Sequence, residues 1–498
     1  MQKPEQFDLL ARLRDPALLH TQAYVGGKWQ SARHDDTFAV ADPATGTILA
    51  HVPAMGAIET REAIAYAEDA LAPWKSLLAK ERARILRRWA DLVLENTEDL
   101  AIILTAEQGK PLAESRAEIA YAASFLEWFA EEAKRVYGDT IPTYAHDRRL
   151  VVLKQPIGVT GGITPWNFPS AMITRKAAPA LAAGCTMVLK PAEQTPLSAL
   201  ALCELAERAG LPAGVLNMVT ASGEGAPAVG SELTGNPAVR KLGFTGSTAV
   251  GRLLMAQCAK GIKKISLELG GNAPFIVFDD ADFDAALDGV VINKFRNSGQ
   301  TCITANRIFV QDSIYDRFVA ELADRAAGLK VASGFDDGVA VGPLIDDQGF
   351  EKVVRHVADA VERGGRIVTG GDPHALGGTF FQPTVIADVT TDATMSCEET
   401  FGPIAGVIRF RDEAEAVRLA NDTPYGLSAY FYSRDIGRVW RVAEALDVGI
   451  VGVNTGVISS EVVPFGGVKE SGIGREGSRY GIDEWLEVKY LNIAGIDR

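Results

Sequence analysis

The sequence predicts an α/β protein built from two doubly wound, Rossmann-like domains. Its 498 residues are more than one hydrophobic core usually serves. From about Leu150, short β-rich runs alternate with helical segments, which is the pattern of a parallel sheet with crossover helices. The alternation begins again at residues 273–280, APFIVFDD, and this second series indicates a second domain of the same class.

The first part of the chain is expected to be mainly helical. Apolar residues recur at helical spacing over 81–100, with charged residues between them. A helix is expected to stop near Gly109 and Pro111, which are common terminating residues. A long amphipathic helix is then expected over about 113–136, closed by Gly138.

The rest of the chain alternates between predicted strands and helices. Strands are expected at 150–163, 186–192, 214–220 and 239–247, and helices at 198–210, 248–261 and 313–329. The tail, EWLEVKYLNIAGIDR, loosely alternates apolar and polar residues, as a strand does. A terminal strand far from the cores often pairs with another chain, so the tail favours oligomerisation.

Composition argues against several classes of protein. The formal net charge of −14 disfavours nucleic acid and anionic membranes as partners. Five widely spaced cysteines without a CxxC pair disfavour a disulfide framework, and the six histidines lack metal-site spacing. The first residues carry early charges and no long apolar run, unlike a signal peptide. We therefore expect a soluble, cytoplasmic protein without a structural metal.

Two loops at predicted strand ends could bind a dinucleotide. FTGSTAVG places Gly246 and Gly251 where a strand turns into a helix, and the free N–H groups of a helix start suit a pyrophosphate. It is neither a GxGxxG fingerprint nor a Walker loop, so a structural turn is an equally open interpretation. Lys190 and Glu193 end another strand, where they could hold ribose hydroxyls or form an ordinary solvated pair.

Two further residues suit acyl chemistry. Glu268 lies between Leu267 and Leu269, and desolvation there would raise its pKa toward that of a general base. An ordinary strand-end carboxylate is the alternative. Asn167 lies in TPWNFP, where a loop made rigid by prolines could fix its amide as an oxyanion donor or simply form an aromatic-packed turn.

Cys302 lies in NSGQTCITANR, among small and polar residues that favour a loop over a core strand. From these residues alone, a nucleophile and a small buried side chain are equally good interpretations. A free thiol is mostly protonated at neutral pH, so a reactive one needs local help.

Seven motifs in order resemble those of the aldehyde dehydrogenase superfamily. They are TPWNFP, LKPAEQTP, GFTGSTAVG, LELGGNAP, GQTCITANR, EETFGP and PFGGVKESGIGRE. The resemblance runs from about Leu18 to the C-terminus. MITRKAAPALAAGCTMVLKP, KFRNSGQTC and GIVGVNTGVISSEVVPFGG are further similar to the succinate-semialdehyde branch of that family.

The resemblance implies a division of the chain into three parts. Residues 1–139 and 159–267 would form the NAD(P)-binding domain, and residues 268–476 the catalytic domain with the nucleophilic cysteine. Residues 140–158 and 477–498 would form a small β element through which the family forms dimers or tetramers.

The resemblance also implies residue roles. Cys302 would be the nucleophile, Asn167 and the Cys302 backbone N–H the oxyanion hole, and Glu268 the general base, with Lys176 near the oxyanion site. The residues matching the family's cofactor contacts are Thr164, Pro165, Trp166, Lys190, Glu193, Gly246, Ser247, Gly251, Leu269, Glu399 and Phe401.

The branch-specific residues imply a substrate with a distal carboxylate. Arg175, Arg296 and Ser459 match the group that binds it, and Phe168 and Phe465 would line the apolar stretch between. The implied reaction oxidises succinate semialdehyde to succinate through a cysteine thiohemiacetal and thioester, as in 4-aminobutyrate degradation. Alternatives are glutarate semialdehyde, which is one methylene longer, a broader range of aldehydes, and a catalytically silent binding protein.

Two departures from the family pattern carry expectations. NADP-preferring bacterial members of the branch tend to have a small polar residue where this chain has Glu193. A carboxylate there would accept hydrogen bonds from a ribose diol and repel a 2′-phosphate, so we expect NAD, with NADP possible. Thr304 replaces a second cysteine that many members carry two positions after the nucleophile.

Because Thr304 offers Cys302 no second thiol, mild peroxide is expected not to inactivate the enzyme through a reversible disulfide in this loop. Over-oxidation of Cys302 to sulfinic acid stays chemically open. The check is activity after peroxide and then dithiothreitol, with peptide mapping. Recovery by dithiothreitol together with a mapped intrachain disulfide to Cys302 would contradict the prediction.

Overall fold

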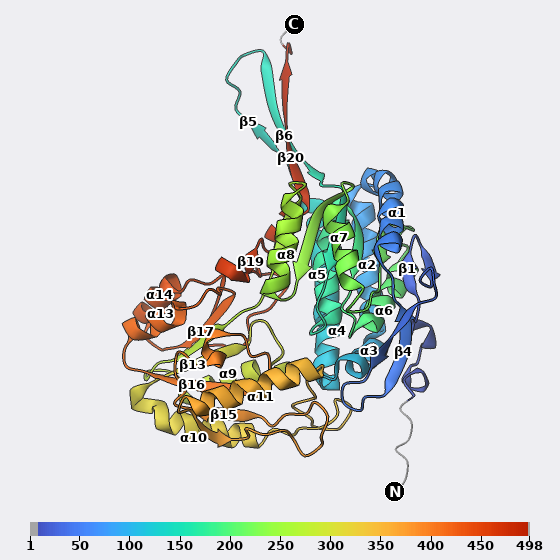
Figure 1. Ribbon diagram of the computed structural model, residues 1–498. Coiled ribbons are helices and arrows are strands. Elements are labelled where there is room, and N and C mark those ends of the chain that lie inside the picture. The colour runs from blue at the N-terminus through green and yellow to red at the C-terminus, as the bar shows by residue number, and fades with distance from the viewer. Residues whose placement is uncertain (1–7, 497–498) are drawn as a thin grey trace.

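The computed structural model of the protein describes residues 8–496 and confirms the α/β class. It has an eight-stranded sheet, a seven-stranded sheet, a three-stranded sheet and a two-stranded sheet. Figure 1 shows the two large sheets in separate lobes, each with helices packed against it, and the three-stranded sheet as an arm that projects from the body.

The eight-stranded sheet has the strand order β19-β11-β10-β7-β8-β9-β1-β2. Its strands are β1 (Ala23–Val25), β2 (Lys28–Gln30), β7 (Val159–Ile163), β8 (Thr186–Lys190), β9 (Leu216–Met218), β10 (Val239–Thr245), β11 (Lys264–Glu268) and β19 (Gly472–Ile473). The five central strands run parallel. In chain order, β8 and β9 are added on one side of β7, and β10 and β11 are then added on the other side. The crevice between the carboxyl ends of β7 and β10 is therefore a topological switch point, where such sheets bind ligands.

The expectation of a mainly helical first part was wrong for the first fifty or so residues. Besides β1 and β2, these residues form β3 (Thr37–Ala41) and β4 (Ile48–Pro53). Strands this short carry too few residues for a periodic signal. A local signal did exist, because Gly26 and Gly27 have φ of 62° and 76° and make the two-residue turn that pairs Val25 with Lys28.

Eight α-helices accompany the first sheet. They are α1 (Ala57–Ser76), α2 (Ala79–Glu95), α3 (Thr97–Gln108), α4 (Leu112–Glu132), α5 (Pro169–Ala183), α6 (Pro196–Arg208), α7 (Ala226–Gly235) and α8 (Thr248–Ala259). Gly109 ends α3 with φ of 90°, which confirms the predicted stop. Every residue of α5 is buried, so its polar side chains face protein on all sides.

The seven-stranded sheet follows the order β14-β15-β16-β13-β12-β17-β18. Its strands are β12 (Ala273–Val277), β13 (Ala305–Gln311), β14 (Arg366–Thr369), β15 (Thr384–Ala387), β16 (Ile404–Phe410), β17 (Ser428–Tyr432) and β18 (Ile450–Val453). The helices of this part are α9 (Phe283–Phe295), α10 (Tyr315–Ala327), α11 (Asp347–Glu362), α12 (Thr394–Cys397), α13 (Glu413–Asn421) and α14 (Ile436–Ala445). The short helix α15 (Tyr480–Asp483) packs against α5 instead. All strands except β14 run parallel to their neighbours, which confirms the second doubly wound unit.

The arm contains β5 (Asp139–Ile141), β6 (Arg148–Pro156) and β20 (Leu486–Ala494). The tail is a strand, as predicted, and it pairs with β6 over its whole length. Apolar side chains such as Val488, Tyr490 and Ile493 are exposed on it. The division into three parts stays a prediction; the first seven residues of its first segment and the last two of its last lie outside the described residues.

Neither a membrane span nor a metal centre is found in the described part of the chain. No helix within residues 8–496 is both long and apolar enough to cross a bilayer. In the same residues, no group of three or more His, Cys, Asp or Glu side chains is placed to hold a metal ion.

A buried ion pair joins the corner between α3 and α4 to the loop after β7. Lys110 Nζ lies 2.6 Å from Glu118 Oε2, and both side chains are fully buried. The same ammonium donates to the Asn167 carbonyl at 2.6 Å, and Glu118 Oε1 accepts from the Ser170 N–H at 2.9 Å. The pair was not predicted, because its two residues, eight positions apart, lie outside every motif that indicates chemistry.

Replacing Lys110 with methionine leaves the Glu118 carboxylate buried without its counter-ion. We expect Lys110→Met to lower the free energy of unfolding by about 3–5 kcal/mol. Urea unfolding followed by tryptophan fluorescence measures the change.

The matched control is Arg87→Met, which removes an exposed pair with Glu127 and should cost about 0–1 kcal/mol. Equal losses of stability in the two variants would show that the buried pair has no special structural role.

Candidate active site

The first large sheet presents the carboxyl ends of its strands to the cavity, and the second presents the amino ends of its strands. The carboxyl ends of β7, β10 and β11 meet the loops that precede β12, β13 and β16. A cavity of about 600 Å³ lies between them. The predicted site residues that line it are Pro165, Trp166, Asn167, Gly246, Ser247, Glu268, Leu269, Cys302, Glu399 and Phe401. The first sheet therefore contributes the switch-point crevice, and the second contributes the predicted nucleophile.

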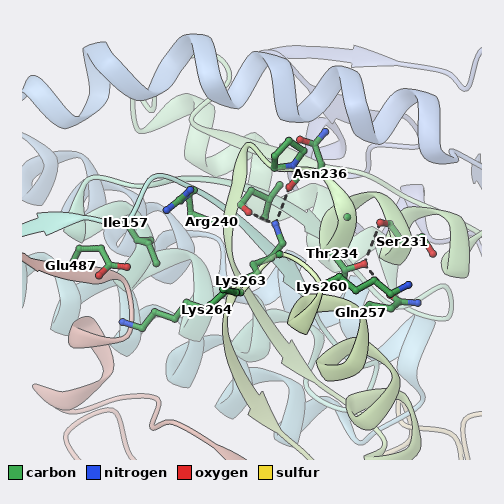
Figure 2. Close-up of a pocket in the computed structure, with 15 residues that line it drawn as sticks. Ile157, Ser231, Thr234, Asn236, Arg240, Gln257, Lys260, Lys263, Lys264 and Glu487 are labelled. Atoms are coloured by element: carbon green, nitrogen blue, oxygen red, sulfur yellow. Dashed lines mark hydrogen bonds between the residues drawn. The ribbon is translucent and has the colours of Figure 1, made fainter.

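A second cavity, of about 510 Å³, lies at the opposite, amino ends of β10 and β11 (Figure 2). Its walls are basic, but they include none of the predicted site residues. Lys263 uses its ammonium group to bond the carbonyl oxygens of Asn236 and Val239, and Glu487 adds an opposite charge. We therefore take the cavity at the switch point as the candidate active site.

Cys302 is half-buried at the floor of this site. Burial raises the pKa of its thiol to about 12, and the nearby Glu399 carboxylate adds to the shift. The thiol is consequently protonated at neutral pH in this arrangement, so nucleophilic attack needs a base. The backbone of Gly271 also packs closely against Cys302, since a Cβ on Gly271 would lie 2.5 Å from the Cys302 carbonyl oxygen.

The loop before Cys302 is held in an unusual conformation. Asn297, Ser298 and Gly299 all lie in the left-handed region, with φ of 49°, 55° and 74°. Non-glycine residues there cost about 1–3 kcal/mol each and persist only when the surroundings fix them. Ser298 Oγ donates to the Gly342 carbonyl at 2.9 Å, and a Cβ on Gly299 would lie 2.2 Å from the Gly402 carbonyl. This close packing holds the loop in the observed conformation.

Asn167, the predicted oxyanion donor, is fixed from several sides. Its side-chain Nδ2 donates to the Gln300 backbone carbonyl at 3.2 Å. Its backbone carbonyl accepts from Asn297 Nδ2 at 3.0 Å and from Lys110 Nζ. The side-chain amide lines the same cavity as Cys302. Because an amide nitrogen carries two hydrogens, the second one is free to donate to a substrate oxygen.

Glu268, the predicted base, ends β11 and is 4% exposed. Burial raises the pKa of its carboxyl well above the usual value, and the Glu476 carboxylate raises it further. Arg175 and Lys176 oppose this shift. The upward shift that its apolar flanks predicted is therefore present, and a base with a pKa closer to neutrality suits proton transfer.

Glu476 is a functional candidate that the sequence analysis missed. Lys176 Nζ donates to Glu476 Oε1 at 2.5 Å and to the Thr245 hydroxyl, and Arg175 Nε lies 3.1 Å from Glu476 Oε2. Burial alone would raise the Glu476 pKa, but Lys176 and Arg175 hold it below the usual value. The only local signal was its place at the end of the GIGRE motif.

The start of α8 forms one side of the cavity, where the resemblance implies a pyrophosphate. Ser247 caps this helix, with its hydroxyl accepting from the Val250 N–H at 3.3 Å. A Cβ on Gly251 would lie 2.4 Å from Leu269, so this glycine serves the packing of the helix on the sheet. Thr164 has a buried hydroxyl without a hydrogen-bond partner among residues 8–496. Free helix N–H groups and an unsatisfied hydroxyl fit a bound dinucleotide.

Glu399 and Phe401 line the cavity where the resemblance implies the nicotinamide. Glu399 Oε1 accepts from the Gly271 N–H at 3.1 Å, and burial raises the pKa of this carboxyl to about 7. Phe401 meets Trp166 edge-on, with ring centroids 5.5 Å apart. Lys352 on α11 lines the same cavity and was not predicted, because no motif surrounds it.

Lys190 ends β8 and Glu193 follows it, and both lie outside the lining of this cavity. Lys190 Nζ lies 3.1 Å from Glu193 Oε2. The pair stands at the same carboxyl edge of the sheet as the switch point, which is where adenosine ribose groups are held in such folds.

The predicted substrate residues form a separate cluster beside the cavity. The guanidinium of Arg175, which is 2% exposed, lies 4.1 Å from the centroid of the Phe465 ring. The Arg296 guanidinium lies 5.2 Å from the Phe168 ring centroid. Arg175 lies on α5, which accompanies the first sheet, and Arg296 follows α9, which accompanies the second; each stacks on one of the predicted aromatic side chains. Ser459 is half-buried in the loop after β18.

Comparisons with known proteins agree with this site. The aldehyde dehydrogenase family model matches residues 29–491. The chain is 63% identical to the glutarate-semialdehyde dehydrogenase of Pseudomonas aeruginosa, over 97% of this chain and 100% of that protein. It is 62% identical to the NADP(+) succinate-semialdehyde dehydrogenase GabD of Escherichia coli, over 97% and 99%. The crystal structure of an E. coli NADP-dependent enzyme superposes with a TM-score of 0.96 at 62% identity, covering 97% of this chain and 100% of that one. The chain therefore belongs to the aldehyde dehydrogenase family.

Proposed function

We propose that the protein oxidises succinate semialdehyde to succinate with reduction of NAD(P). The observation that carries the proposal is the buried Arg175 guanidinium, whose Nη2 has no hydrogen-bond partner in the described part of the chain. A buried cation with an unsatisfied edge calls for an anionic ligand. Glutarate semialdehyde is the second candidate, because its carboxylate suits the same cluster and a relative of equal similarity is named for it.

The first step forms a bond between Cys302 Sγ and the aldehyde carbon. The thiol proton passes to the Glu268 carboxylate, which lines the same cavity. Negative charge develops on the former carbonyl oxygen, where Asn167 Nδ2 and the Cys302 N–H donate to it. Each such donor is typically worth about 3 kcal/mol in the transition state.

The second step completes the oxidation and releases the acid. When bound, NAD(P) would supply the hydride acceptor for conversion of the Cys302 thiohemiacetal into a thioester. Glu268, after releasing its first proton to solvent, takes a proton from water, and the resulting hydroxide attacks the thioester carbonyl. The C–S bond breaks, succinate leaves, and Cys302 departs as the thiolate and is reprotonated.

We further propose that residues 1–139 and 159–267 hold the cofactor and that residues 268–476 carry the catalytic cysteine. The arm of residues 140–158 and 477–498 would join protomers into a dimer or tetramer, since its exposed apolar side chains favour burial against a second copy. We also propose that the enzyme acts in the cytoplasm.

The substrate proposal predicts a higher kcat/KM for succinate semialdehyde than for glutarate semialdehyde, because one methylene is worth about 1–3 kcal/mol. Arg296→Ala should raise the KM for both by tenfold or more, since a charge-assisted hydrogen bond is lost. Steady-state rates with both aldehydes measure these effects.

Cys302→Ala is the control for the chemistry and should abolish NAD(P) reduction. A clear preference for the five-carbon substrate would make glutarate semialdehyde the better assignment. Unchanged kinetics in Arg296→Ala would point instead to an enzyme for aldehydes in general, and undiminished activity in Cys302→Ala would refute the mechanism.

For the cofactor, we expect NAD to give the higher kcat/KM, since the Glu193 carboxylate accepts from ribose hydroxyls and repels a 2′-phosphate. Glu193→Ser should raise the kcat/KM for NADP by about tenfold, which is about 1.4 kcal/mol, and lower that for NAD. The exposed Glu207 on α6 supplies the matched control, Glu207→Ser. A wild-type enzyme that prefers NADP would overturn the expectation.

A further inference from the structure

Tyr121 lies on α4, against the cluster that contains the two arginines. Its ring meets Phe125, one helical turn further along α4, edge-on with centroids 4.9 Å apart. Phe125 in turn lies under Arg175, whose guanidinium carbon is 5.5 Å from that ring centroid. The packing of Tyr121 is therefore continuous with the packing of Arg175.

The hydroxyl oxygen of Tyr121 is fully buried and donates to no group at hydrogen-bonding geometry within residues 8–496, although the Ser459 hydroxyl lies near enough to act on it as a donor. A buried donor without an acceptor is destabilising. Such groups are rare in native proteins, and a ligand that accepts the hydrogen bond is one explanation for them. The ring contact with Phe125 would be made equally well by phenylalanine, so packing does not account for the hydroxyl.

Cationic and polar groups surround this hydroxyl. Burial raises its pKa, while Arg175, the Ser459 hydroxyl and Arg296 act in the opposite direction. Both guanidinium groups are therefore close enough to act on the same oxygen. With its pKa raised, the hydroxyl keeps its proton at neutral pH, so it acts toward an anion as a hydrogen-bond donor.

The cluster holds further donors without a partner. Besides the Tyr121 hydroxyl, Nε and Nη2 of Arg175 have no partner at hydrogen-bonding geometry in the described chain, although Nε is in ion-pair contact with Glu476. Glu476 is shared with Lys176, so Arg175 has no carboxylate to itself. A buried guanidinium edge without a hydrogen-bond partner, beside a free hydroxyl donor, describes a site for a small anion.

We propose that Tyr121 is a specificity-determining residue, whose hydroxyl donates a hydrogen bond to the distal anionic group of the semialdehyde alongside Arg175 and Arg296. The inference rests on the proposed function, since it needs a substrate with a distal anion. Tyr121 then contributes a directional, uncharged donor to a site that otherwise recognises charge, and it favours a substrate whose anion lies at one fixed distance from Cys302.

The test is Tyr121→Phe, which keeps the ring contact and removes only the hydroxyl. The KM for succinate semialdehyde should rise about tenfold and kcat should change by less than about twofold, because the bond is present before and during the reaction. The inhibition constant of succinate should rise by the same factor. Butanal has the same chain length without the carboxylate, and its kcat/KM should stay unchanged.

Two controls separate this inference from the proposed function. Tyr137→Phe removes the hydroxyl of a tyrosine that is 72% exposed and should change none of these values. If Arg296→Ala weakens binding of the semialdehyde and Tyr121→Phe does not, the inference is wrong and the proposed function stands. If neither variant changes the ratio of kcat/KM for succinate semialdehyde to kcat/KM for butanal, both the inference and the proposed function are wrong. An equal loss of kcat/KM for butanal in Tyr121→Phe would make Tyr121 a packing residue and also refute the inference.

Discussion

The ion pair between Lys110 and Glu118 supports most of the catalytic geometry. Two charges that are fully removed from water persist only when they meet each other and enough hydrogen-bonding groups. Here the remaining groups belong to functional segments: the Asn167 carbonyl accepts from the ammonium, and the Ser170 N–H donates to the carboxylate. The loop that holds Asn167, the proposed oxyanion donor, and the start of α5 are thereby fixed to one buried pair. Because α5 carries Arg175, the distal cluster depends on the same pair.

The electrostatics of the site are a balance of opposing charges in a medium of low dielectric constant. Glu268 and Glu476 are both buried, and each opposes ionisation of the other. Lys176 and Arg175 offset this mainly at Glu476, which stays ionised while Glu268 is held closer to neutrality. The protein thus assigns different tasks to two carboxylates through the position of two cations. Cys302 follows the same logic, since burial keeps its thiol protonated until a base removes the proton.

Much of the fold could be predicted from the sequence, because long helices and the alternation of strands and helices leave periodic patterns. The strands β1 to β4 were not predicted, because three to six residues are too few to show a periodic pattern. The site was predictable only as far as local motifs reach. Cys302, Glu268 and Asn167 lie in such motifs, and each stayed ambiguous until their order was compared with the family's. Glu476 and Tyr121 depend on partners distant in the chain, as Lys176 and Glu476 show at a separation of 300 positions, and no local pattern encodes such contacts.

The distal cluster is divided between the two halves of the chain, and this has a consequence for recombination. Tyr121 and Arg175 come from helices that precede the second sheet, whereas Arg296 and Ser459 follow in its own loops. A chimera that joins the first half of one family member to the second half of another would therefore inherit half of the proposed anion site from each parent. Under the proposed function, substrate preference would then not be transferred with Cys302 alone, and both halves would have to change together.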